Sequence, residues 1–145
     1  MLKNTALKVM LAAALFFSDM SGQDQREMER VLDGIALVES RSYYDIDGYF
    51  QYIDTRVGKA GERGPYQMTR IAFNQIKKPG ETFARLSTDF EFARTCANRY
   101  LNWLLANSAK GNVGLAIEYY NSGPNRRSRT YLQKVYNAMQ LLKLQ

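Results

Sequence analysis

The feature that most constrains the fold of this chain is a long helical repeat of apolar residues in its second half. Between Ser87 and Asn107, apolar side chains recur every three or four residues, which is the spacing of one helix face. The stripe consists of Phe90, Ala93, Ala97, Tyr100, Leu101 and Leu104, widened by Cys96 and Trp103. A stripe this wide predicts a central, buried helix. Thr88 and Glu91 match a capping box at its start.

Shorter stripes of the same period predict further helices on both sides of this one. We expect them over residues 24–40, 69–76, 112–120 and 128–142. The stretch Arg41–Gly64 has no such period and contains Asp47-Gly48, a hairpin-type turn. The chain of 145 residues shows no interdomain linker. It therefore predicts a single, mainly α (α+β) domain with a small irregular or β lobe after the first helix.

The N-terminus has the layout of a secretory signal peptide. Lys3 and Lys8 precede the apolar run Val9–Phe17, and small and polar residues follow. The run is too short to span a bilayer. We expect residues 1–22 to be a signal peptide with an approximate cleavage site, and residues 23–145 to be exported to the periplasm, the extracellular space or the cell wall. The alternative is an N-terminal helix of the folded domain.

Composition excludes several kinds of chemistry. The chain has no His and one Cys, which excludes a Ser/His or Cys/His nucleophile system, a His-ligated metal and an internal disulfide. We expect no metal and no cofactor. The net charge of +6 suits an anionic partner such as nucleic acid, a membrane surface or an acidic wall polymer. Arg126, Arg127 and Arg129 form a cluster that favours nucleic acid, but an export signal argues against that partner.

Glu39 lies on the apolar face of its predicted helix. It continues a stripe formed by Met28, Leu32, Ile35 and Ala36, at spacings of three and four residues. A carboxyl at the end of an apolar stripe loses hydration, which favours its protonated form. A carboxyl that is protonated at neutral pH is what general acid catalysis requires. The alternative is that the helix ends at Glu39 and its side chain turns into water.

Three short patterns stand out along the chain. They are Ala-Leu-Val-Glu-Ser at 36–40, Gly-Glu-Arg-Gly-Pro-Tyr-Gln-Met at 61–68, and Ala-Ile-Glu-Tyr-Tyr-Asn-Ser-Gly-Pro at 116–124. With a later Tyr before a Val, they resemble, in order, the motifs of the lytic transglycosylases, lysozyme-like enzymes that cleave bacterial peptidoglycan. The resemblance spans Leu32–Val135. It departs from the family in the middle of the Gly-to-Gln turn and in a longer stretch before that turn.

The resemblance implies that residues 23–145 form a lysozyme-like transglycosylase domain with Glu39 as its general acid and base. It implies cleavage of the β-1,4 bond between N-acetylmuramic acid and N-acetylglucosamine, which leaves 1,6-anhydro ends and consumes no water. Tyr120 would hydrogen-bond and orient Glu39, and Gln67 and Asn121 would hold the sugar amide and hydroxyls. The other expected substrate contacts are Ser40, Met68 and Tyr131. The alternatives are a core Tyr120, an exposed Gln67 and a helix-terminal Asn121.

A second carboxylate is the usual requirement for hydrolysis of a glycosidic bond. Goose-type lysozymes, relatives of this fold, have acidic residues just before and just after the Gly-to-Gln turn. Those places hold Gly58 and Thr69 here, and neither is acidic. Their absence favours transglycosylation. Asp54 and Glu62 are the nearest spare carboxylates, and either would support a lysozyme-type muramidase, which is a hydrolase.

Aromatic residues are dense in the stretch after the first predicted helix, at Tyr43, Tyr44, Tyr49, Phe50 and Tyr52. Aromatic faces pack on the apolar faces of sugar rings, so these residues are candidate saccharide contacts. A small hydrophobic cluster that pins the lobe is an equal alternative.

The expected partners are peptidoglycan glycan strands. By analogy with other small wall-cutting domains, a secretion, conjugation, pilus or phage assembly is a further expected partner, for which the enzyme would open the wall. The alternative of another class is a catalytically silent glycan-binding or scaffold domain of such an apparatus.

Overall fold

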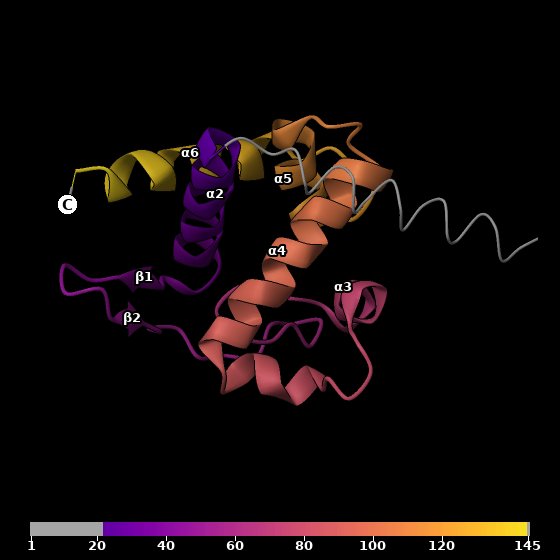
Figure 1. Ribbon diagram of the computed structural model, residues 1–145, viewed down its shortest axis with the longest axis horizontal. Helices are drawn as coiled ribbons and strands as arrows, with labels where there is room; N and C mark the ends of the chain where they lie inside the picture. Colours follow the sequence, from indigo (N-terminus) through magenta and orange to yellow (C-terminus); the bar gives the residue numbers. More distant parts are fainter. Residues whose placement is uncertain (1–21, 145) are drawn as a thin grey trace, which may run out of the picture.

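A computed structural model describes residues 22–144, and the predicted signal peptide therefore falls outside the described residues except for Gly22. The elements, in order, are α2 (Gly22–Ser40), β1 (Tyr43–Tyr44), β2 (Phe50–Gln51), α3 (Arg70–Ile76), the 3-10 helix η1 (Phe83–Ser87), α4 (Phe90–Asn107), α5 (Val113–Ser122) and α6 (Arg129–Leu142) (Figure 1). This confirms the predicted mainly α fold with a small β lobe. Among the described helices, none is long and apolar enough to cross a membrane.

Helix α4 runs diagonally through the middle of the molecule, as its wide apolar stripe predicts (Figure 1). It begins at Phe90, and the Asp89 side chain caps it by accepting the Phe92 N–H at 3.0 Å. The predicted capping box of Thr88 and Glu91 was wrong. The residues before the helix are taken up by η1, so the N-terminal cap falls one residue later than predicted.

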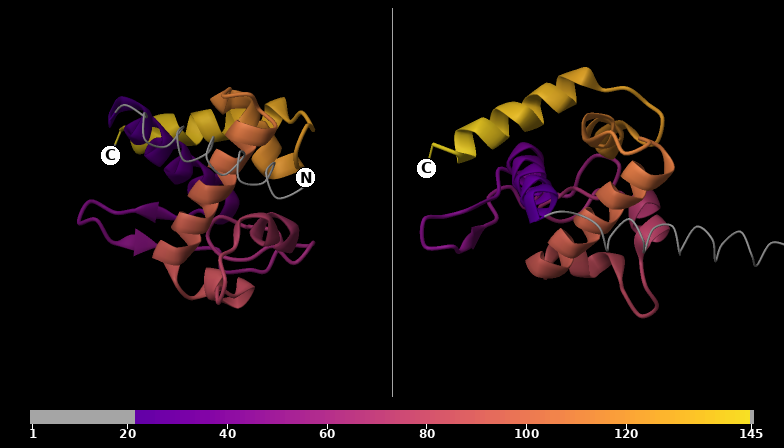
Figure 2. Two further views of the ribbon diagram at one scale, coloured as in Figure 1. Left: turned by 45° about the vertical axis from the view of Figure 1, so that its right-hand side comes forward. Right: turned by 45° about the horizontal axis from the view of Figure 1, so that its top comes forward.

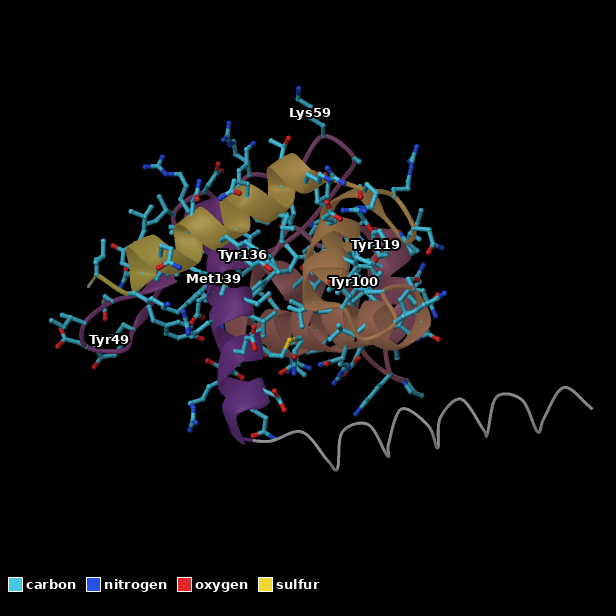
Figure 3. The ribbon with its side chains drawn as sticks, turned by 90° about the horizontal axis from the view of Figure 1, so that it is seen from above. Tyr49, Lys59, Tyr100, Tyr119, Tyr136 and Met139 are labelled. Atoms are coloured by element: carbon cyan, nitrogen blue, oxygen red, sulfur yellow. The ribbon has the colours of Figure 1, made fainter. Side chains whose placement is uncertain are left out.

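Helices α2 and α6 pack closely against each other, because α2 carries a glycine at their contact. A Cβ atom at Gly34 would lie 2.8 Å from Met139 Cγ and 3.1 Å from the Val135 carbonyl oxygen. Seen from above, Met139 and α6 lie across α2 (Figure 3). This close approach brings the beginning of α6 to the C-terminal end of α2.

Strands β1 and β2 form an antiparallel hairpin, the small β lobe of the fold. Both views in Figure 2 show that the hairpin extends away from the helices. Its aromatic rings pack on one another and on the start of α4. Ring centroids are 5.0 Å apart for Tyr44 and Phe50, 5.5 Å for Phe50 and Phe90, and 5.1 Å for Tyr52 and Phe90. This cluster fixes the lobe to the helical body.

The shorter helices begin at polar caps near the predicted positions. The Thr69 side chain accepts the Ala72 N–H at 3.1 Å at the start of α3, and Asn112 accepts the Leu115 N–H at 2.9 Å at the start of α5. Helix α5 ends at Ser122 and is capped by Gly123, which is part of the predicted stop. A side-chain acceptor at the N-cap satisfies a backbone donor that the helix itself leaves free.

Candidate active site

A tight turn between Arg63 and Met68 forms the centre of the candidate site. The backbones of these two residues exchange hydrogen bonds of 3.0 Å, and the Gln67 N–H donates to the Gly64 carbonyl at 3.0 Å. Gly64 has a φ of 77°, and a Cβ atom there would lie 2.3 Å from the Leu86 carbonyl oxygen. Only glycine fits this position, since any side chain would meet both backbone strain and a steric clash.

Three helices hold this turn in place. The Ser40 hydroxyl, at the end of α2, donates to the Pro65 carbonyl at 2.7 Å. The Tyr120 hydroxyl of α5 donates to the Tyr66 carbonyl at 2.9 Å, and Arg94 Nη1 of α4 donates to the Tyr66 hydroxyl at 3.0 Å. The turn is therefore fixed relative to the ends of α2 and α5, where the predicted site residues lie.

A cavity of about 280 Å³ opens beside the turn, and we refer to it as the Glu39 cavity. Its lining residues come from α2, the loop after the hairpin, the turn, α3, α4 and α5: Glu39, Gly58, Lys59, Glu62, Gln67, Met68, Thr69, Ala72, Tyr100, Tyr120 and Asn121. The predicted site residues that it brings together are Glu39, Glu62, Gln67, Met68, Tyr120 and Asn121. They come from four separate stretches of the chain.

Glu39 occupies the last turn of α2. Arg41, with a φ of 58°, leaves the helical conformation, and its N–H caps the Leu37 carbonyl at 3.1 Å. The Glu39 side chain is half-buried, and its Oε1 accepts a hydrogen bond of 2.6 Å from the Tyr131 hydroxyl. The carboxyl is thus held between α6 and the cavity, and it does not turn away into water.

Burial raises the pKa of Glu39 from 4.5 to about 7. The hydrogen bond from Tyr131 lowers the pKa, the negative charge of Glu62 raises it, and the positive charge of Lys134 lowers it. Desolvation dominates because it penalises only the charged form of the carboxyl. At neutral pH, both forms of Glu39 are well populated, which is the state that a group needs to donate and then accept a proton.

The resemblance implied that the Tyr120 hydroxyl would orient Glu39. In the structure, the hydroxyl that bonds to Glu39 belongs to Tyr131. Tyr120 lines the cavity, but its hydroxyl is used by the Tyr66 carbonyl. Tyr131 reaches Glu39 because α6 packs along α2. Burial and the nearby Glu39 charge raise the pKa of Tyr131 well above its usual value, so its hydroxyl keeps the proton that it donates.

Ser40 and Met68 differ in their relation to the cavity, although both were expected to contact substrate. Ser40 is 1 % exposed, and its hydroxyl bonds to the Pro65 carbonyl and to Ser42 Oγ, each at 2.7 Å. It holds the turn and does not face the cavity. Met68 is also buried, but it lines the cavity wall.

The two candidate second carboxylates lie in different environments. Asp54 is outside the cavity lining and forms a two-pronged pair with Arg56, at 2.8 Å to Nε and 2.5 Å to Nη2. These hydrogen bonds lower the pKa of Asp54 to about 2. Glu62 lines the cavity, where its Oε2 accepts the Ala60 N–H at 3.0 Å. Of these two carboxylates, only Glu62 lines the cavity.

The aromatic residues that were candidate saccharide contacts do not reach the Glu39 cavity. None of Tyr43, Tyr44, Tyr49, Phe50 and Tyr52 lines it. Tyr49 is 70 % exposed and lies at the far edge of the molecule, well away from Lys59 beside the cavity (Figure 3). The ring contacts described above favour the alternative of a hydrophobic cluster that pins the lobe.

Several cavity residues were not predicted from the sequence. Tyr100 lines the cavity while its ring stacks on Trp103, with centroids 6.0 Å apart. The position of Tyr100 in the apolar stripe of α4 predicts that the residue is buried, but it does not predict that the residue lines a cavity. The same is true of Lys59 and Ala72, which no sequence pattern marks. Thr69 was noted only as a place where an acid is missing.

The predicted arginine cluster is divided in the structure. Arg127 Nε lies 2.5 Å from Oε2 of Glu118, which is 0 % exposed. The side chains of Arg126 and Arg129 are exposed to solvent. One of the three arginines is therefore committed to an internal ion pair, which weakens the case for a nucleic-acid surface.

No protein-family model, curated protein or solved structure matches this chain. Within residues 22–144, no three His, Cys, Asp or Glu side chains are grouped so that they would hold a metal ion. Function is therefore inferred from the side chains of the Glu39 cavity and from their geometry.

Proposed function

We propose that this protein is a lytic transglycosylase of lysozyme-like fold. It cleaves the β-1,4 bond between N-acetylmuramic acid and N-acetylglucosamine in peptidoglycan, with Glu39 as general acid and base. The observation that carries the proposal is the Glu39 carboxyl, which lines a cavity, accepts a hydrogen bond from Tyr131 and has a pKa of about 7. A titratable group that is perturbed in this way within a cavity is a candidate for acid–base catalysis.

The proposed reaction uses Glu39 twice. Its protonated carboxyl first gives a proton to the glycosidic oxygen while the bond from that oxygen to the anomeric carbon breaks. The substrate's own N-acetyl group assists by stabilising the anomeric carbon. Glu39, now a carboxylate, then takes the proton of the sugar 6-hydroxyl as that oxygen closes on the anomeric carbon. The Tyr131 hydrogen bond stabilises the carboxylate that the first step produces.

Gln67 and Asn121 have the chemistry to hold the sugar. Gln67 Nε2 donates to the carbonyls of Gly64, at 2.9 Å, and Arg56, at 3.2 Å. Both amide donors of Gln67 are then in use, and its Oε1 is the atom that can accept the N–H of an acetamido group. Asn121 is exposed at the cavity and offers both a donor and an acceptor to sugar hydroxyls.

A second candidate function is hydrolysis by a lysozyme-type muramidase. The position of Glu62 in the same cavity favours it, because hydrolases add a second carboxylate that activates water or forms a covalent bond to the sugar. The products would carry a reducing end in place of a 1,6-anhydro ring.

The proposed setting is outside the cytoplasm, in the periplasm or at the cell wall, because peptidoglycan is located there. A net positive charge suits a polymer rich in carboxylates. Local opening of the wall for a secretion, conjugation, pilus or phage assembly fits a small enzyme, and this part of the proposal rests on analogy.

The test is to digest purified peptidoglycan with the protein and to weigh the soluble products, with Glu39→Gln as the control. Products with 1,6-anhydro ends that are absent with the variant support a lytic transglycosylase. Reducing-end products support the hydrolase. A folded protein that binds peptidoglycan but releases no product would instead indicate a silent glycan-binding or scaffold domain.

A further inference from the structure

A single basic side chain stands in the wall of the Glu39 cavity. Among the described residues, Lys59 is the only basic residue that lines it. Lys59 is exposed, and its side chain extends away from the loop that carries it (Figure 3). In the described part of the chain it takes part in no ion pair, whereas Arg56 is paired with Asp54. The ammonium group of Lys59 is therefore available to an anion that enters the cavity.

The loop that carries Lys59 closes on itself, which fixes the position of its backbone. The Gly58 N–H donates to the Glu62 carbonyl at 3.0 Å, and the Gly61 N–H donates to the Gly58 carbonyl at 2.9 Å. The Ala60 N–H donates to Oε2 of Glu62 at 3.0 Å. These hydrogen bonds lie on both sides of Lys59 along the chain, so they hold this residue beside the cavity.

The acidic side chain of the same loop does not neutralise Lys59. Glu62 turns back toward Gly58, where an added Cβ atom would lie 2.0 Å from Glu62 Oε2. The carboxylate is stabilised there by the Ala60 N–H, and within residues 22–144 it forms no ion pair. The loop therefore presents two separate charges to the cavity, one negative and one positive.

A second positive charge acts on the site from α6. Lys134 is exposed and follows Tyr131, the residue that bonds to Glu39, by about one helical turn. The positive charge of Lys134 lowers the pKa of Glu39, so its field reaches the carboxyl. Like Lys59, it forms no ion pair with any residue that the structure describes. An anionic group of a substrate at this site is therefore attracted by two lysines from two different elements.

Peptidoglycan carries its negative charges close to the bond that is cut. The sugar rings are uncharged, but the lactyl group of N-acetylmuramic acid holds a short stem peptide with free carboxylates. We propose that Lys59 binds a stem-peptide carboxylate, so that the enzyme selects strands whose peptides are charged. The inference rests on the proposed cleavage of peptidoglycan by Glu39. An ammonium group and a carboxylate form a charge-assisted hydrogen bond, which is stronger than a bond between neutral groups. Lys134 adds attraction at longer range.

The experiment compares native peptidoglycan with peptidoglycan whose carboxylates have been converted to amides by carbodiimide and ammonia. The glycan and the length of the peptides are the same in both substrates, so they differ only in charge. We expect the unmodified protein to cleave native strands with a kcat/KM about three- to tenfold higher, between the effects of an exposed ion pair and a charge-assisted hydrogen bond. The preference should shrink at high salt, because salt screens exposed charges.

Three variants assign the preference to Lys59. Lys59→Gln should lower kcat/KM on native strands by the same factor and leave it within about twofold on amidated strands. Lys59→Arg keeps the positive charge and should keep the preference. Lys143→Gln removes an equal charge at the C-cap of α6, outside the cavity lining, and should leave the preference unchanged.

Each outcome separates this inference from the proposed function. Equal cleavage of native and amidated strands by the unmodified protein would overturn the role of Lys59 and leave the proposed cleavage standing. A preference that survives in Lys59→Gln, or that falls as much in Lys143→Gln, would show an effect of net charge and would also overturn that role. An equal loss on both substrates in Lys59→Gln would do the same. No products from either substrate would overturn the proposed function, and this inference with it.

Discussion

At the scale of single residues, the site depends on the hydrogen bond between Tyr131 and Glu39. This bond favours the charged form of the carboxyl and lowers its pKa, while burial raises it. In Tyr131→Phe, we expect the alkaline limb of the pH–rate profile to move to higher pH. The maximal rate should fall about ten- to a hundredfold, because a hydrogen bond to a charged group contributes ~1.5–3 kcal/mol. Peptidoglycan digestion across pH 5–9 would measure both.

Tyr136→Phe is the matched control for that change. Tyr136 lies on the same helix but is exposed, and it does not line the cavity. Its removal should leave the rate and the pH profile unchanged. If Tyr131→Phe gave an equally unchanged profile, the hydrogen bond would have no part in setting the pKa of Glu39.

The raised pKa of Glu39 also predicts how stability depends on pH. A folded-state pKa of about 7, against 4.5 for the free side chain, means that the folded protein binds this proton more tightly than the unfolded chain. The contribution to stability is complete below about pH 4.5 and is lost as the pH rises through about 7. Glu39→Gln should therefore raise the free energy of unfolding at pH 8 by about 1–3 kcal/mol.

Urea unfolding at pH 8 and at pH 4.5 would check this prediction. The free energy of unfolding of Glu39→Gln should exceed that of the unmodified protein at pH 8, and the difference should shrink at pH 4.5. An equal difference at both pH values would show that burial does not raise the pKa of Glu39.

At the scale of elements, the site depends on the close packing of α2 on α6. In Gly34→Ala, the added methyl would lie 2.8 Å from Met139 Cγ and 3.1 Å from a backbone oxygen, so the two helices must separate. Overpacking of this kind costs about 1–3 kcal/mol. We expect a lower melting temperature, and a lower rate as well, because Tyr131 moves away from Glu39. Thermal unfolding and peptidoglycan digestion would measure the two effects.

Gly114→Ala, in the first turn of α5, is the matched helical control. The three nearest atoms to an added Cβ there all belong to side chains, at 3.3 Å for Asn112, 3.5 Å for Tyr136 and 3.7 Å for Leu132. Alanine in a helix is favoured over glycine by about 0.5–1 kcal/mol, so the variant should be no less stable than the original. A loss of stability equal to that of Gly34→Ala would argue against a special contact between α2 and α6.

The elements themselves were largely predictable from the sequence. Every described α-helix begins and ends within three residues of its predicted limits, because apolar periodicity and stop signals act locally. The error in the predicted start of α4 arose because two neighbouring residues could each serve as its N-cap. Asp89 and Thr88 are adjacent candidates for the N-cap; Asp is the stronger N-cap residue, and Thr88 is taken up as the C-cap of the 3-10 helix before α4.

The site was predictable only in part, because its contacts join distant residues. Tyr131 and Glu39 are 92 positions apart, and their contact depends on how α6 packs on α2. Spacing to the turn pointed to Gly58 and Thr69 as places for an acid. It did not show that the carboxylate of Glu62 folds back into the space beside Gly58, since that depends on the loop conformation.

At the scale of the whole molecule, the connection between α5 and α6 closes the structure. This loop, residues 123–128, returns the chain so that α6 packs on α2, at the other end of the described chain, and delivers Tyr131 to Glu39. Arg127 anchors the loop to α5 by pairing with the fully buried Glu118. Burial of a carboxylate without such a partner is strongly unfavourable.

Arg127→Gln therefore tests whether this anchor matters to the fold and to the site. Loss of one partner from a buried ion pair lowers the free energy of unfolding by ~3–5 kcal/mol. Because Arg127 is half-exposed, we expect a loss at the lower end of this range, about 3 kcal/mol. The rate of peptidoglycan cleavage should fall as well, because the loop sets the start of α6. Arg126→Gln, one residue earlier and exposed, removes the same charge and should change neither quantity. Equal effects of the two substitutions on urea unfolding would indicate that net charge, and not the pair with Glu118, is what the cluster contributes.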